Sequence, residues 1–286
     1  MLRYASAMNH DAFYIRQDPR PLTSTGTGTV VSTLTPTPAV AGPWDSGLQH
    51  GGPVAALLAT EMELLAPRPG LRLGQLSLDF LSPVPVRPLQ VATQIVRPGK
   101  KIELRSALLS AEEAPNNAAR PVARAAAWFL LTAPDRSPAV HLSEPLPPRP
   151  DREITELFPS LPRFGYGESL EWRFTSGGFD APGPATVWTR LRVRLVRDEP
   201  VQPLIHALAL VDSANGISAE LDPARYLFVP VNLTVSIARL PVGPWVGMSA
   251  RTELASEGAG IVHARLFDDS GYFGQAMQTL FVEPRK

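Results

Sequence analysis

Cysteine is absent from this chain of 286 residues. That absence excludes disulfide bonds, a thiolate nucleophile and a zinc site with cysteine ligands. An excess of charge of either sign is also missing, because 27 Lys and Arg residues balance 27 Asp and Glu residues. The sequence therefore lacks the electrostatic pattern of proteins that bind nucleic acid or an anionic membrane surface, and we expect neither partner.

Long apolar runs are missing as well. No stretch reaches the length of a membrane span, and residues 1–8 contain no apolar segment long enough for a signal peptide. We therefore expect a cytoplasmic protein. No two histidines have metal-ligand spacing, and neither a phosphate-binding glycine loop nor a Gly-x-Ser-x-Gly nucleophile motif occurs. We expect no metal and no cofactor.

The sequence does contain two strongly apolar segments, each followed by four alternating segments that end at proline or glycine. Apolar residues on nearly every face of a helix predict a buried helix. Alternation with short turns predicts antiparallel strands. The expected helices are residues 54–65 and 203–221. The strands expected after them are residues 76–81, 89–96, 102–109 and 121–131, then 227–237, 245–254, 260–267 and 272–282.

A proline-rich stretch separates two parts that share this plan. We take residues 1–140 as the first repeat, 141–165 as a semi-rigid linker and 166–286 as the second repeat. Before the helices we expect further strands at residues 28–34, 167–174 and 186–196. The predicted fold class is α+β, a duplicated unit in which an antiparallel sheet wraps a long helix.

Asp212 follows the second apolar segment, in the sequence Val-Asp-Ser-Ala-Asn-Gly. A carboxylate set among apolar residues must be paired, hydrogen-bonded or used in chemistry. The alternative is that Asp212 only satisfies a turn, as Asp and Asn often do.

Several motifs, in this order, resemble the bacterial acyl-CoA thioesterase II group and its thioesterase-like relatives. They are Trp-Asp-Ser-Gly-Leu-Gln-His-Gly-Gly at 44–52, Phe-Leu-Ser-Pro-Val-Pro at 80–85, Val-Asp-Ser-Ala-Asn-Gly at 211–216, Asn-Leu-Thr-Val-Ser-Ile-Ala-Arg-Leu-Pro at 232–241 and the segment 268–278. The resemblance implies a double hotdog, in which two tandem hotdog repeats mimic a two-fold dimer. It also implies an acyl-CoA substrate and the possible assembly of such protomers into a homo-oligomer.

The resemblance further implies a catalytic site of three residues. Asp212 matches the family's Asp, and Gln278 matches its Gln on the closing strand. The family's hydroxyl residue falls nearer Pro230, which has no hydroxyl, so Thr234 is the best candidate for that role. The implied reaction is hydrolysis of an acyl-CoA thioester to free acid and CoA by a water that Asp212 and Gln278 aim.

The first half lacks equivalents of these residues, since its closing strand has alanines at 125–127 where the second half has Gln278. We therefore expect one working site per chain. The first half would contribute substrate contacts through His50, and the N–H groups of Gly51 and Gly52 would receive the developing oxyanion. The alternative for His50 is a residue at the start of the helix that makes a backbone hydrogen bond.

Two other functions stay open. A non-catalytic acyl-binding or scaffold protein would explain the missing hydroxyl. A hotdog hydratase or dehydratase would pair an Asp with a His along one helix, but the residue five after Asp212 is Ile217.

Overall fold

The computed structural model describes residues 10–17, 28–65, 67–112, 119–132, 137–140, 145–157, 161–200 and 202–285. Part of the expected linker, residues 141–144 and 158–160, lies outside the described residues. Within the described residues, thirteen strands form one sheet in the order β7-β8-β11-β12-β13-β10-β3-β6-β5-β4-β2-β1-β9. Every strand pairing is antiparallel except that of β1 with β9.

The strands of the first half include the alternating segments expected there. They are β1 (Ala12–Arg16), β2 (Val30–Pro36), β3 (Leu71–Phe80), β4 (Leu89–Arg97), β5 (Ile102–Glu112) and β6 (Ala119–Leu131). Those of the second half are β7 (Leu170–Gly178), β8 (Ala181–Leu191), β9 (Arg194–Val196), β10 (Tyr226–Ile237), β11 (Val246–Leu254), β12 (Ala259–Asp268) and β13 (Gly271–Pro284). The pairing of β3 with β10 joins the two halves into one sheet, with Leu78 opposite Leu233.

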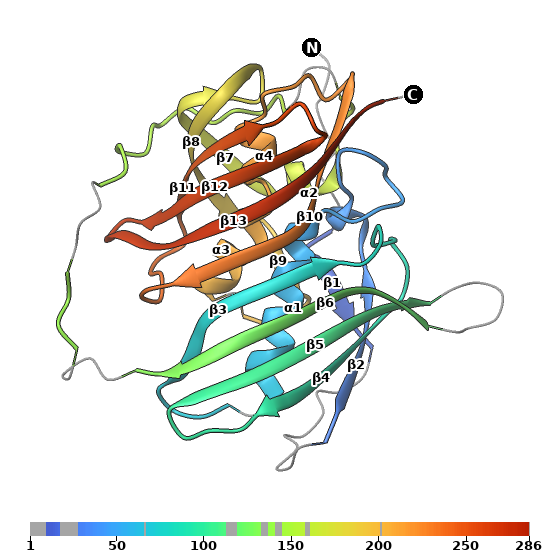
Figure 1. The fold of residues 1–286 in the computed structure, drawn as a ribbon, viewed down its shortest axis with the longest axis vertical. Helices are drawn as coiled ribbons and strands as arrows, with labels where there is room; N and C mark the ends of the chain where they lie inside the picture. The colour runs from blue at the N-terminus through green and yellow to red at the C-terminus, as the bar shows by residue number, and fades with distance from the viewer. Residues whose placement is uncertain are drawn as a thin grey trace.

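Two apolar helices lie against one face of this sheet, α1 (Gly51–Leu65) and α3 (Pro203–Val211) (Figure 1). They contact each other, and α1 also contacts the strands of the first half. Helices that are apolar on nearly all sides bury most of their surface, as these two do. The expected double hotdog, an α+β fold, is confirmed.

Three segment boundaries were predicted wrongly. The strand expected at residues 167–174 begins only at Leu170, because residues 167 and 168 belong to a short helix. The second helix ends at Val211 rather than continuing to residue 221, and a separate turn of helix, α4 (Ala214–Ile217), follows. The strand expected at residues 186–196 is divided into β8 and β9, and β9 pairs with β1 of the first half. The remaining short helices are a 3-10 turn, η1 (Pro38–Val40), and α2 (Gly165–Glu168). The break after Val211 matters most, because Asp212 lies in it.

Candidate active site

Asp212 lies at the C-terminal end of α3, and its side chain is buried, with 4% of the residue exposed. Its backbone stays in the α region, but its N–H bonds to Leu210 O rather than continuing the helical ladder. The carboxylate lies beside the first residues of α1, and the backbone N–H groups of Gly51 and Gly52 favour its charged form. The N-terminus of a helix favours an anion because its N–H groups are unpaired and its dipole is positive there.

Glycine is required at both positions of this contact. A Cβ atom on Gly51 would lie 2.7 Å from Asp212 Oδ2 and 2.5 Å from Phe80 Cζ. A Cβ atom on Gly52 would lie 2.0 Å from the carbonyl oxygen of Ala209 in α3. The two glycines therefore allow the start of α1 to approach the end of α3.

Gln278 reaches the same carboxylate from β13. Its Nε2 donates to Asp212 Oδ1 at 3.0 Å and lies 3.4 Å from the Asp212 carbonyl oxygen. Its Oε1 is buried, and within the described chain it has no hydrogen-bond partner. Asp212 and Gln278 were predicted to share one site, and the structure brings their side chains together.

The environment of Asp212 changes its acidity. Burial raises the pKa of Asp212 to about 7, and the hydrogen bonds from Gly51, Gln278 and Gly52 limit that rise. Burial in a medium of low dielectric constant disfavours the charged carboxylate, which is why the shift is upward. A carboxylate with a pKa near neutrality can exchange protons at the pH where an enzyme works.

His50 lies on the other side of the carboxylate, with Nδ1 3.3 Å from Asp212 Oδ2. The N–H of Gly52 also donates to this Nδ1 at 3.1 Å, so Nδ1 accepts a hydrogen bond and the neutral ring carries its hydrogen on Nε2. Burial lowers the pKa of His50 to about 3. His50 therefore enters the site as a neutral imidazole.

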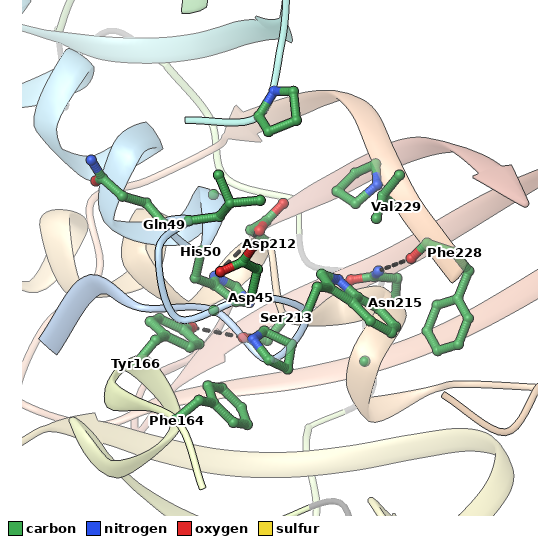
Figure 2. A pocket seen from close by; sticks show the side chains of 18 of the residues that line it. Asp45, Gln49, His50, Phe164, Tyr166, Asp212, Ser213, Asn215, Phe228 and Val229 are labelled. Atoms are coloured by element: carbon green, nitrogen blue, oxygen red, sulfur yellow. Dashed lines mark hydrogen bonds and ion pairs between the residues drawn. The ribbon is translucent and has the colours of Figure 1, made fainter. Parts of the chain in front are cut away.

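The ring of Tyr166, from α2, stacks on the His50 imidazole with 3.7 Å between centroids and 6° between planes. Its hydroxyl donates to Ala209 O at 2.8 Å and lies 2.6 Å from Ser213 Oγ. Figure 2 shows Tyr166 bonded to Ser213 below His50 and Asp212. One side chain thus contacts both the loop before α1 and the turn after α3.

These residues open onto a pocket of ≈ 370 Å³, to which His50, Gly51, Asp212 and Ser213 contribute (Figure 2). Most of its wall is apolar and aromatic. The aromatic residues that line it are Trp44, Phe80, Phe164, Tyr166, Trp172, Phe179 and Phe228. Among the described residues, no lysine or arginine lines it. An apolar chamber with a few polar groups at one end suits an apolar ligand.

The placement of Thr234 differs from expectation. In the pairing of β10 with β13, Leu233 lies opposite Gln278 and Thr234 lies opposite Met277, which is 49% exposed. Because neighbouring strand residues point to opposite faces, Thr234 points away from Asp212 and Gln278. A register shift between Pro230 and Asn232 determines which residues of β10 point toward Gln278. Val229 and Pro230, neither of which has a hydroxyl, line the pocket at the place where the hydroxyl residue was expected.

Tyr166 and Ser213 were not predicted as parts of this site. Ser213 follows Asp212 directly, so its position could have been suspected from the sequence. Tyr166 stacks on a residue 116 positions earlier in the chain, and no local pattern signals such a contact.

A second pocket of ≈ 330 Å³ lies at the opposite ends of the helix pair. Thr60 and Glu63 of α1 and Ile205 of α3 line it. Burial raises the pKa of Glu63 to about 7, and the charge of Arg105 lowers it in part. This is the position that the approximate two-fold relation between the halves gives to a second site.

No group of three His, Cys, Asp or Glu residues in the described chain could hold a metal ion. Within the same residues, no helix is long and apolar enough to cross a membrane.

Solved structures with the same fold include a hot dog protein of unknown function from Alicyclobacillus acidocaldarius. It has a TM-score of 0.70 and 16% identity, covering 91% of this chain and 97% of that one. The acyl-CoA thioesterase II TesB2 from Mycobacterium marinum has a TM-score of 0.60 and 15% identity, with 87% and 96% covered. The dehydratase domain from the CurJ module of curacin polyketide synthase has a TM-score of 0.57 and 11% identity, with 96% and 98% covered. No curated protein matches the chain.

The fold defines a double-hotdog protein. The chain belongs to the acyl-CoA thioesterase family, because the model of that family's C-terminal domain matches residues 134–282 and the model of its N-terminal domain matches residues 40–130. It is therefore a thioester hydrolase, and the family implies an acyl-CoA substrate.

Proposed function

We propose that this protein hydrolyses acyl-CoA thioesters with Asp212 as the general base. One observation carries the proposal. The carboxylate lies at the N-terminus of α1, has a pKa raised to about 7 by burial, and faces an aromatic-walled pocket. A base with that pKa is half ionised at neutral pH and can take a proton from a bound water.

In the proposed reaction, water attacks the thioester carbonyl carbon as one of its protons passes to Asp212. The carbonyl oxygen becomes an oxyanion, and the C–S bond breaks when this intermediate collapses. The thiolate takes the proton from Asp212, which restores the carboxylate and releases CoA and the free acid. CoA is a good leaving group, so no stronger acid is needed.

Gln278 holds the carboxylate in both of its states. Its Nε2 donates to Oδ1 while Asp212 is ionised. When Asp212 is protonated, a flip of the amide presents Oε1, which is otherwise unpaired in the described chain, to the carboxyl hydrogen. This role is orientation of the base rather than direct bonding to the substrate.

His50 is the donor that we assign to the oxyanion. Of the two N–H groups expected to take that role, that of Gly52 donates to His50 Nδ1 instead, and that of Gly51 faces Asp212. The neutral His50 ring carries its remaining hydrogen on Nε2, and His50 lines the pocket. A hydrogen-bond donor aimed at the developing charge typically changes the rate by 10²- to 10³-fold.

The experiment is release of thiol from a panel of acyl-CoA esters, short to long and aromatic, detected with DTNB. Because the chain has no cysteine, every thiol detected comes from the substrate. Release of thiol with equal free acid, measured by mass spectrometry, is expected for at least one ester. No release from any ester would contradict the proposal and favour an acyl-binding protein.

The contact between His50 and Asp212 favours one second candidate, dehydration of a 3-hydroxyacyl thioester. In that reaction a base removes the proton next to the carbonyl, and the hydroxyl leaves with a proton as water. His50 comes from the other half of the chain, so its absence from the helix beside Asp212 did not exclude such a pair. Its tautomer argues against the reaction, since a protonated Nε2 cannot act as the base. An enoyl product from 3-hydroxybutyryl-CoA, with no thiol released, would establish dehydration.

A further inference from the structure

We propose that Ser213 supplies the hydroxyl of this active site and that Tyr166 is the positioning residue that sets its hydrogen-bond direction. The inference rests on the proposed hydrolysis by Asp212. Ser213 follows Asp212, is 4% exposed and lines the same pocket. Thr234, the hydroxyl expected from the sequence, lies on the opposite face of the sheet.

The direction of the hydrogen bonds follows from counting protons. Tyr166 has one hydroxyl hydrogen, and the carbonyl of Ala209, 2.8 Å away, can only accept it. The hydrogen in the 2.6 Å contact between Tyr166 and Ser213 must then come from Ser213. Ser213 is left with lone pairs and no free hydrogen, so toward the pocket it acts as an acceptor.

An acceptor is what a water beside Asp212 requires. The water donates one hydrogen to the Asp212 carboxylate, to which that proton passes in the reaction, and its other hydrogen to Ser213 Oγ. Both hydrogens are then fixed by neighbouring residues of one turn, and a lone pair is left for the thioester carbon. Holding a nucleophile in one orientation lowers the barrier by removing rotational freedom before the reaction.

Tyr166 is suited to fix this arrangement because it is held at both of its ends. Its ring stacks on His50, and its hydroxyl is bound to two residues of the α3 turn. Burial raises the pKa of Tyr166 far above its usual value, so the phenol keeps its hydrogen at every working pH. The direction of the Ser213 hydrogen bond is therefore constant.

The test compares Ser213→Ala, Ser213→Thr and Tyr166→Phe by thiol release from the best acyl-CoA ester. Ser213→Ala is expected to lower kcat about 10- to 100-fold with KM changed less than about 2-fold, because it removes an interaction of the water rather than of the acyl group. Ser213→Thr is expected to restore most of the rate. Tyr166→Phe keeps the ring on His50 and frees the Ser213 hydrogen, and a fall in kcat of about 10-fold is expected.

A matched pair of buried hydroxyls serves as the control. Ser218 Oγ lies 2.8 Å from Thr252 Oγ1 and donates to Ala214 O, and neither residue lines the pocket. Ser218→Ala and Thr252→Val are expected to lower the melting temperature comparably while kcat stays within about 2-fold. A Ser213→Ala enzyme with the wild-type kcat, or with no greater loss than Ser218→Ala, would overturn the inference. Either result leaves the proposed hydrolysis standing, whereas a wild-type protein without thiol release defeats that proposal itself.

Discussion

The two ends of the helix pair α1 and α3 occupy equivalent places in a duplicated fold and differ in chemistry. At one end, Asp212 meets two glycine N–H groups and the amide of Gln278. At the other end, Glu63 and Gln202 line one pocket, and α3 begins with Pro203, which has no N–H to offer. The strand pair Leu233–Gln278 corresponds to Leu76–Ala127, so the second end also lacks the amide.

The sheet and the helix are duplicated, but the donors around the carboxyl group are not. Both ends contain a pocket and a carboxyl group with a pKa near 7. Only at the Asp212 end do hydrogen-bond donors, such as the amide of Gln278, hold the ionised carboxylate in one orientation. In the described chain, no hydrogen bond to the carboxylate of Glu63 occurs. We therefore infer that orientation, rather than a raised pKa alone, separates the working end from the other.

The largest expected effect tests the contact between the helices at the Asp212 end. Gly52→Ala places a Cβ 2.0 Å from Ala209 O, a backbone atom that cannot move without α3. Overpacking of this kind typically costs about 1–3 kcal/mol. A fall in melting temperature and loss of thiol release are expected. Gly42→Ala, with its nearest atom at 3.4 Å, is the control for stability and should keep the wild-type melting temperature.

The amide that distinguishes the two ends is tested next. Gln278→Ala removes the donor to Asp212 Oδ1 and should lower kcat about 10- to 100-fold, equivalent to about 1.4–2.7 kcal/mol in the barrier. KM should change little, because Gln278 does not line the pocket. Steady-state kinetics measure both. Equal falls at Thr234→Val, which points away from the site, would mean that the loss is not specific to the amide.

The pH dependence of hydrolysis sharpens the assignment of the base. Asp212 must be ionised to accept a proton, and its pKa is raised to about 7. We expect kcat/KM to fall about tenfold per pH unit below that value and to reach a plateau above it. An inflection near pH 4, the ordinary range for Asp, would show that the working carboxylate is not buried as described.

The stability of the protein should also depend on the ionisation of Asp212. Activity is expected to rise with pH, whereas stability is expected to fall. The folded pKa of about 7 exceeds the ordinary 3.8, so between these values the folded chain binds more protons and loses stability as the pH rises. Asp212→Asn removes this cost and should raise the free energy of unfolding at pH 8 by about 1–4 kcal/mol, with no gain below pH 4. Glu63→Gln should act in the same direction and less strongly, since Glu63 is partly exposed. Denaturant unfolding at the two pH values measures both variants.

Much of the fold was visible in the sequence because its signals are local. Alternation marked most strands, and unbroken apolar character marked both helices. The end of α3 was missed because Asp212 to Ile217 stays close to helical geometry while Asp212 turns its N–H to Leu210. The division of the strand at 186–196 was missed because β9 is defined by its pairing with the distant β1.

The residues of the candidate site could be predicted only where the type of residue itself indicates a chemical role. Asp212 could be named as a carboxylate after an apolar helix, whereas Gln278 could be joined to it only through the resemblance to the thioesterase II group. Thr234 could not be placed, because a shift of one residue in register turns every side chain to the other face, and the irregularity between Pro230 and Asn232 leaves no clear signal in the sequence. The linker boundaries, the cytoplasmic location and the oligomeric assembly stay predictions.

The most direct test of the account is thiol release by Asp212→Asn measured beside Glu63→Gln, two matched replacements of a carboxylate by an amide at the two ends of the helix pair. The account predicts a fall in kcat of at least about 10³-fold for Asp212→Asn in a folded protein, and a rate within about 2-fold of the wild type for Glu63→Gln. Comparable losses in both variants would contradict a single working end. A wild-type rate in Asp212→Asn would remove Asp212 from the mechanism.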